Sequence, residues 1–122
     1  MVAATHPKHT SHQIQDEVLG IMADHVITKI SSSIHDAPYI SVMSDETTDI
    51  SNKEQMTVVI HWVTADFEVH EEFVALYTVP SIDSNTIFTK IMDALKLLNV
   101  SVNKLRGQCY DGASTMHGIK MV

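Results

Sequence analysis

The stretch Tyr39-Ile40-Ser41-Val42-Met43-Ser44-Asp45-Glu46-Thr47-Thr48-Asp49 is a short apolar run followed by an acidic, hydroxyl-rich cluster. Because β-branched and aromatic residues favour strands, we predict a buried strand over residues 39–44. Asp45 then stands at the carboxyl end of this strand, and an acidic loop continues to residue 54. Open α/β sheets bind ligands in the crevice beyond the carboxyl ends of their strands. The stretch therefore predicts that Asp45 belongs to a functional site.

A second stretch has the same form, Leu105-Arg106-Gly107-Gln108-Cys109-Tyr110-Asp111-Gly112-Ala113-Ser114. We predict a strand over residues 104–110 and the start of a helix at residue 112, with Asp111 between them. Asp45 and Asp111 are thus two carboxylates in equivalent positions.

The remaining segments are predicted from hydrophobic periodicity and from residues that begin or end helices and strands. Residues 1–10 are expected to form a disordered lead-in, and residues 11–122 the domain. A helix with one apolar stripe is predicted over 11–34, strands over 55–63 and 68–79, and a second helix from residue 83 or 84 to about 99.

The order of these elements is helix, three strands, helix, strand. Two short connections make the three strands an antiparallel meander, and a crossover helix makes the fourth strand parallel to one of them. A ribonuclease H-like domain begins in this way, with its first and fourth strands as neighbours. We therefore predict an α/β fold that is the first part of a ribonuclease H-like fold, with Asp45 and Asp111 side by side.

Composition limits the function further. The chain has 122 residues and a net charge of −7, with eight scattered Lys and Arg, which is unlike the basic stripe of a protein that binds nucleic acid unaided. Cys109 is the single cysteine, so an intrachain disulfide is excluded and a reducing compartment is expected. No apolar run has the roughly 18 residues needed to span a membrane. We expect a nuclear or cytosolic location and no membrane partner.

Two neighbouring carboxylates repel each other unless a cation lies between them. Hard divalent ions with oxygen ligands, Mg²⁺ or Mn²⁺, meet this need. Paired ions of this kind clamp the attacking and leaving oxygens of a phosphodiester. The pair Asp45 and Asp111 therefore favours polynucleotide hydrolysis or strand transfer.

Each of these residues also has a simpler interpretation. Asp45 can lie in a solvated turn with side chains bonded to backbone, and Asp111 can form a turn or cap the final helix. Cys109 is expected to pack in the core rather than act as a nucleophile. Arg106 is the one basic residue expected near the site, where it could contact phosphate.

Two motifs resemble those of the hAT (hobo/Ac/Tam3) transposase-like proteins. They are Asp45-Glu46-Thr47-Thr48-Asp49-Ile50-Ser51-Asn52-Lys53-Glu54-Gln55 and Arg106-Gly107-Gln108-Cys109-Tyr110-Asp111-Gly112-Ala113-Ser114. The similarity is strongest to the branch that includes zinc finger MYM-type proteins and the repressor of the inhibitor of the protein kinase. It covers about residues 11–118.

The resemblance implies a catalytic domain that uses an Asp-Asp-Glu triad and Mg²⁺ for DNA strand transfer. By position, Asp45 matches the first aspartate and Asp111 the second, whereas the glutamate has no counterpart here. DNA is the partner that the resemblance implies for the ancestral full-length protein, and the nucleus is the implied compartment.

Two hypotheses follow. The first is a truncated, transposon-derived catalytic fragment that holds a metal ion and is inactive alone. The second is a domesticated module without enzymatic activity that serves protein interaction or regulation. Uncovered strand edges and apolar faces would favour pairing of this chain with a second copy or with another protein.

Overall fold

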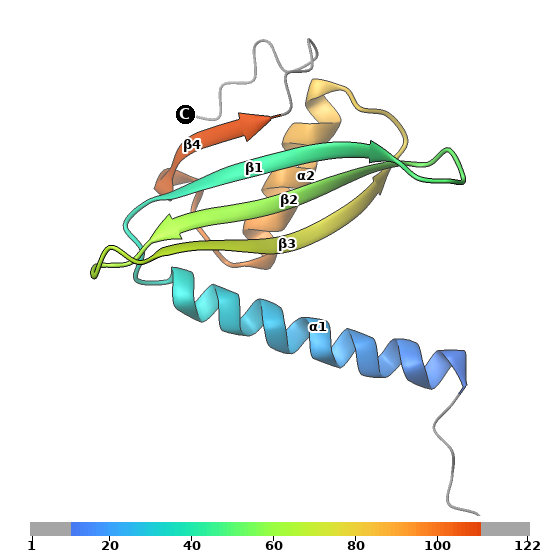
Figure 1. The fold of residues 1–122 in the computed structure, drawn as a ribbon, viewed down its shortest axis with the longest axis horizontal. Helices are drawn as coiled ribbons and strands as arrows, with labels where there is room; N and C mark the ends of the chain where they lie inside the picture. The colour runs from blue at the N-terminus through green and yellow to red at the C-terminus, as the bar shows by residue number, and fades with distance from the viewer. Residues whose placement is uncertain (1–10, 111–122) are drawn as a thin grey trace, which may run out of the picture.

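The computed structural model describes residues 11–110, which form one four-stranded sheet and two α-helices (Figure 1). The expected lead-in at residues 1–10, Asp111 and the expected helix after it lie outside the described residues. In chain order the elements are α1 (His12–Ile34), β1 (Ile40–Thr48), β2 (Glu54–Val63), β3 (Val69–Val79), α2 (Ser84–Leu97), a short 3-10 helix (Val102–Lys104) and β4 (Leu105–Tyr110).

The strand order is β3-β2-β1-β4. β1 pairs antiparallel with β2, β2 pairs antiparallel with β3, and β4 lies parallel to β1 after the crossover through α2. The predicted meander, the crossover and the pairing of the first and fourth strands are therefore confirmed. This is the α/β arrangement with which a ribonuclease H-like domain begins.

The core lies between one face of the sheet and α2 (Figure 1). Alternate residues of β2 point into it, because successive strand side chains face opposite ways. The fully buried side chains are Ile34, Val42, Met56, Val58, Ile60, Ile87, Ile91, Leu95, Leu98 and Leu105. Within residues 11–110, no helix lies over the opposite face of the sheet, which we call the open face.

A bulge in β3 changes which of its side chains face the core. Val58 pairs with Ala75 and Val59 with Phe73, so Val74 is the extra residue. The alternation of side chains along β3 therefore breaks at its centre, since a bulge shifts the side-chain phase by one. On one side of the bulge Ala75 faces the core, and on the other side His70 does so and stacks on Trp62 with ring centroids 5.0 Å apart.

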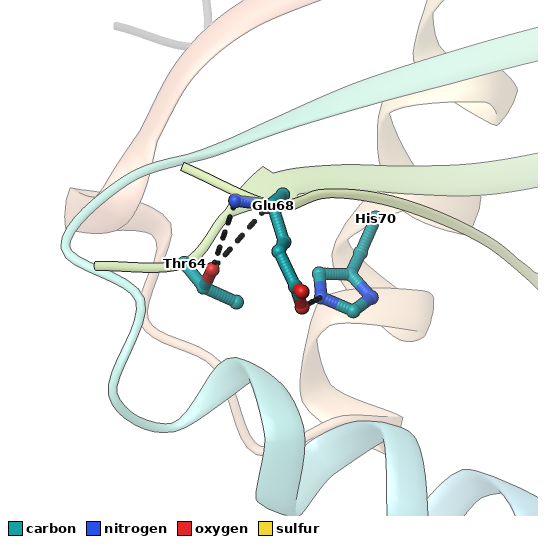
Figure 2. A network of polar contacts seen from close by, with 3 residues as sticks. All are labelled: Thr64, Glu68 and His70. Atoms are coloured by element: carbon teal, nitrogen blue, oxygen red, sulfur yellow. Dashed lines mark hydrogen bonds and ion pairs between the residues drawn. The ribbon is translucent and has the colours of Figure 1, made fainter. Parts of the chain in front are cut away.

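The turn between β2 and β3 is closed by polar contacts (Figure 2). The Thr64 amide donates to the Glu68 carbonyl at 2.9 Å, and the Glu68 amide donates to Thr64 Oγ1 at 3.1 Å. The Glu68 carboxylate lies 3.8 Å from His70 Nε2. Phe67 takes a positive φ of 64° to make this turn, a conformation that is uncommon outside glycine and asparagine.

α1 packs against the domain only at its C-terminal end. Ile30 and Ile34 are buried, Ser31 Oγ donates to the Leu98 carbonyl at 2.6 Å, and Lys104 Nζ donates to the His35 carbonyl at 2.7 Å. The rest of the helix extends away from the sheet (Figure 1). The C-terminal part of the predicted stripe is therefore buried, but its N-terminal part is exposed, with Val18, Ile21, Met22 and Val26 each 48–69% accessible.

Across the part of the chain that the structure describes, neither helix is long and apolar enough to cross a membrane.

Candidate functional site

Asp45 lies inside β1 rather than beyond its end. The strand runs to Thr48, because Thr47 and Thr48 continue the ladder with β2 opposite Gln55 and Glu54. The predicted strand end at residue 44 is therefore wrong by four residues. β-branched threonines fit a paired strand, and the loop that was expected over residues 45–54 shrinks to the tight turn between β1 and β2.

The pairing of β1 with β4 ends next to Asp45. Met43 is opposite Cys109 and Ser44 is opposite Tyr110, the last described residue of β4. The next residue in the sequence after Tyr110 is Asp111, which is outside the described residues. The adjacency of the two strands is thus confirmed, whereas the meeting of the two carboxylates stays a prediction.

The Asp45 side chain belongs to the open face. Ile40, Val42 and Ser44 are buried toward α2, so the alternation of the strand directs Met43 and Asp45 the other way. A shallow hollow of about 380 Å³ lies here, lined by Met43, Ser44, Asp45, Thr57, Val59, Cys109 and Tyr110. It lies at the end of the β1–β4 pairing.

The Asp45 carboxylate keeps capacity for a ligand. Oδ1 accepts one hydrogen bond, at 2.9 Å from the Glu46 amide, and the residue is exposed. A carboxylate oxygen that faces solvent is the type of ligand that Mg²⁺ or Mn²⁺ takes, so Asp45 fits a hard cation. Among residues 11–110, no three His, Cys, Asp or Glu side chains gather in a metal-binding group, so a complete site needs ligands from beyond these residues.

Thr57 is a part of this site that sequence reasoning missed. It pairs with Asp45 across the β1–β2 ladder, and its Oγ1 donates to the Asp45 carbonyl at 3.1 Å. This bond holds the backbone at Asp45. The hairpin register identifies Thr57, but this register depends on where the turn begins, and the sequence predicts a turn that begins four residues too early.

Asp49, four residues further on, has a structural role. Its Oδ1 accepts bonds from the Ser51 amide at 2.8 Å, the Ser51 hydroxyl at 2.7 Å and the Lys53 amide at 2.9 Å. These bonds lower the pKa of Asp49 below its ordinary value, with the Ser51 hydroxyl making the largest contribution. Asn52 takes a positive φ of 59° in the same turn. The acidic cluster thus divides into a candidate ligand, Asp45, and a carboxylate that closes the turn.

Two further residues differ from expectation. Cys109 is exposed rather than packed in the core, because its pairing with Met43 places it on the open face. Arg106 lies beside the start of β1, not near Asp45: its strand neighbours Leu105 and Gly107 pair with Ile40 and Ser41. Ser41 is four residues before Asp45 in β1. At about 3.3 Å per residue, Arg106 therefore lies roughly 13 Å or more from Asp45.

Tyr110 and Ser44 border the hollow. Tyr110 is half-buried, and this burial raises the pKa of its phenol. Its hydroxyl lies 3.4 Å from Gln108 Oε1. Ser44 is buried, and its Oγ has no hydrogen-bond partner within the described structure. Buried hydroxyls normally have a partner, so Ser44 is an unusual residue in the centre of the sheet.

The fold and the position of Asp45 define the class as an α/β domain with ribonuclease H-like strand order. The chain belongs to the family described as DUF4371, the ZMYM1/FAM200, RNase-like domain, whose model matches residues 1–120. Together with the relatives below, this match supports a transposase-like, RNase-like domain, the coarser part of the resemblance.

Two curated relatives are similar over most of the chain. The general transcription factor II-I repeat domain-containing protein 2 of Mus musculus is 30% identical over 116 residues, which are 93% of this chain and 12% of that protein. The protein of the same name from Bos taurus is 32% identical over 98 residues, 78% of this chain and 10% of the relative. The chain therefore spans about a tenth of the length of these relatives.

Proposed function

We propose that this chain is the metal-binding half of a hAT-type transposase catalytic domain, in which Asp45 and Asp111 together hold Mg²⁺ or Mn²⁺. The observation that carries the proposal is the parallel register of β1 and β4. It reaches Ser44 and Tyr110, and one further step of the same register would join Asp45 to Asp111.

The geometry around Asp45 supports this assignment in three ways. The carboxylate is exposed in a hollow, its backbone is held by Thr57, and β1 is a central strand with neighbours on both sides. A functional site is held more precisely on a strand than on a loop.

When bound, the metal would polarise a phosphodiester and stabilise the charge that develops on its oxygens. The role of the chain is to hold two carboxylates at one end of the sheet. The resemblance implies a third carboxylate, a glutamate for which this sequence has no matching position. We therefore expect metal binding but no strand transfer from the chain alone.

Calorimetric titration with Mn²⁺ tests the proposal. We expect saturable binding to the 122-residue chain that is weakened at least tenfold in both Asp45→Asn and Asp111→Asn. The control is Asp49→Asn, which removes a carboxylate from the same hairpin but one already occupied by the turn. Equal loss in all three variants would show only diffuse attraction to an acidic protein and would reject the site.

The exposed apolar surface favours a second candidate, a non-enzymatic interaction module. α1 exposes its stripe, and the edge strand β3 exposes Phe73 and Leu76 at 56% and 51%. Exposed apolar surface is a feature of protein contact sites. Sedimentation equilibrium distinguishes the two: a chain that associates but binds no Mn²⁺ supports this candidate instead.

The partner and the compartment are part of the proposal. DNA would be the substrate of the full-length ancestor, and the nucleus the compartment in which it acts, with the cytosol as the alternative. The chain's charge of −7 is consistent with a catalytic domain that approaches DNA through bound metal and through other domains.

A further inference from the structure

A second hollow, of about 460 Å³, lies on the open face at the opposite end of β1 from Asp45. Its lining includes Tyr39, Ser41, His61, Val63, Arg106 and Gly107. The proposed metal site uses none of these residues. We infer that this hollow binds a nucleotide of single-stranded DNA, with Tyr39 and Arg106 as a stacking platform and Arg106 as the phosphate contact.

Arg106 is held in place before any ligand arrives. Its guanidinium carbon lies 4.8 Å from the centre of the Tyr39 ring. Its Nη1 donates to the Asn103 carbonyl at 2.6 Å and to the Leu105 carbonyl at 3.1 Å. Fixing a planar guanidinium in this way leaves its remaining N–H donors available at small entropic cost.

Tyr39 gives the site its flat surface. Tyr39 is 57% exposed as a residue, even though Arg106 lies over its ring. Aromatic rings paired with arginine are the usual platform for unpaired bases, because every base has a face that can stack.

Gly107 lines the hollow and has no side chain that would fill it. A Cβ at this position would lie 3.0 Å from the Ser41 Cβ, so a larger residue would force Ser41 to shift by a few tenths of an ångström. His61 pairs with Ser41 on the next strand and is half-buried. Its ring adds a polar edge to the floor. Glu71 of β3 pairs with His61. The positively charged end of the hollow is therefore the end formed by Arg106.

This hollow is close enough to the hollow at Asp45 for one continuous DNA strand to reach both. The two hollows share the open face and are separated by about four residues of β1, roughly 13 Å. A few nucleotides cover this distance, at about 3.4 Å each in duplex form and more when extended. The inference rests on the proposed function for the identity of the ligand, but binding here requires neither metal nor Asp45.

Fluorescence anisotropy with a short fluorescein-labelled oligothymidylate, at low salt and in EDTA, measures this binding directly. We expect Tyr39→Ala and Arg106→Gln each to raise Kd about tenfold, in line with the loss of one stacking contact. Lys96→Gln is the matched control, since it removes one positive charge from an exposed position on α2, and we expect less than a twofold change.

Three results would overturn the inference. They are no measurable binding by the unmodified chain, equal weakening by Lys96→Gln and Arg106→Gln, and displacement of the DNA by polyglutamate as readily as by unlabelled oligothymidylate. Tyr39→Ala leaves the Arg106 bonds to the Asn103 and Leu105 carbonyls in place, so it tests stacking even if Arg106→Gln perturbs the fold.

Asp45→Asn separates this inference from the proposed function. We expect its DNA affinity in EDTA to equal that of the unmodified chain. If Mn²⁺ titration fails but Tyr39 and Arg106 still determine DNA binding, the catalytic proposal falls and the nucleotide site stands. If Mn²⁺ binds and DNA does not, the nucleotide site falls and the catalytic proposal stands.

Discussion

At the scale of single residues, the acidic motif contains carboxylates with different tasks. Asp45 is exposed and accepts one bond from its neighbour, whereas Asp49 accepts three bonds and closes the turn. Sequence alone could show that these residues mattered but not which was structural, because the distinction depends on where the turn begins. The structure resolves it through Thr47 and Thr48, which extend the strand past Asp45.

Asp49 should make stability depend on pH. Its pKa is lowered from 3.8 in the folded chain, so its contribution is fully present above about 3.8 and is lost as pH falls through the lowered pKa. We predict that Asp49→Asn lowers the thermal midpoint at pH 7 and that the difference shrinks in acid. Circular dichroism melts across pH check this. Asp66→Asn, in the turn between β2 and β3, is the control; an equal effect there would contradict the assignment.

Removing the Ser44 hydroxyl should stabilise the fold, whereas removing a hydrogen-bonded serine hydroxyl should destabilise it. Because its buried Oγ has no partner in the described structure, we predict that Ser44→Ala stabilises the fold by about 1 kcal/mol. Ser31→Ala removes a bond to the Leu98 carbonyl. It should destabilise by about 0.5 kcal/mol, since the lost bond outweighs the gain in helix propensity. Urea unfolding measures both, and destabilisation by Ser44→Ala would reveal a partner for that hydroxyl.

At the scale of elements, alternation and helical periodicity predicted every strand and helix among residues 11–110, apart from the single turn before β4. These two patterns did not predict the features that depend on how the strands pair. The bulge at Val74 arises from the register with β2, and the positive φ at Phe67 has no sequence signal, unlike those at Asn52 and Asn99. Asparagine tolerates the left-handed region, whereas phenylalanine does so only when the turn requires it.

Two glycines test the packing of their elements. An alanine at position 107 would press on the Ser41 Cβ at 3.0 Å, so we predict that Gly107→Ala destabilises by about 1–3 kcal/mol. Gly20, in the exposed part of α1, has nothing within 4 Å of an added Cβ. Gly20→Ala should therefore stabilise by about 0.5–1 kcal/mol through helix propensity. Chemical denaturation of both variants checks the pair, and a neutral Gly107→Ala would mean that β1 and β4 are less tightly apposed.

At the scale of the whole molecule, the described chain is a well-packed layer of sheet and α2 with a projecting helix. The sequence predicted the apolar stripe of α1 but not that most of it would lack a partner, because periodicity reports which side chains share a face and not what covers them. Likewise, the hollow at Tyr39 depends on the pairing of β1 with β4 and has no signature in either segment alone.

Uneven packing should produce uneven protection from hydrogen exchange. Isolated helical segments shorter than about 12–15 residues are marginal in water. Residues 15–26 of α1 are exposed, whereas α2 buries Ile87, Ile91, Ala94 and Leu95. We predict that amides of residues 14–26 exchange far faster than those of α2. Mass-spectrometric exchange at low protein concentration measures this. Equal protection would show that α1 is covered, for instance by a second copy.

The adjacency of Asp45 and Asp111 is the central claim, and Mg²⁺ titration followed by ¹H–¹⁵N NMR tests it most directly. We predict that the amide signals of Asp45 and Asp111 shift together and saturate with one affinity, while that of Asp49 remains unchanged. If both signals stay still in a folded sample, or if they titrate with different affinities, the two carboxylates do not share a metal ion and the proposed site is wrong.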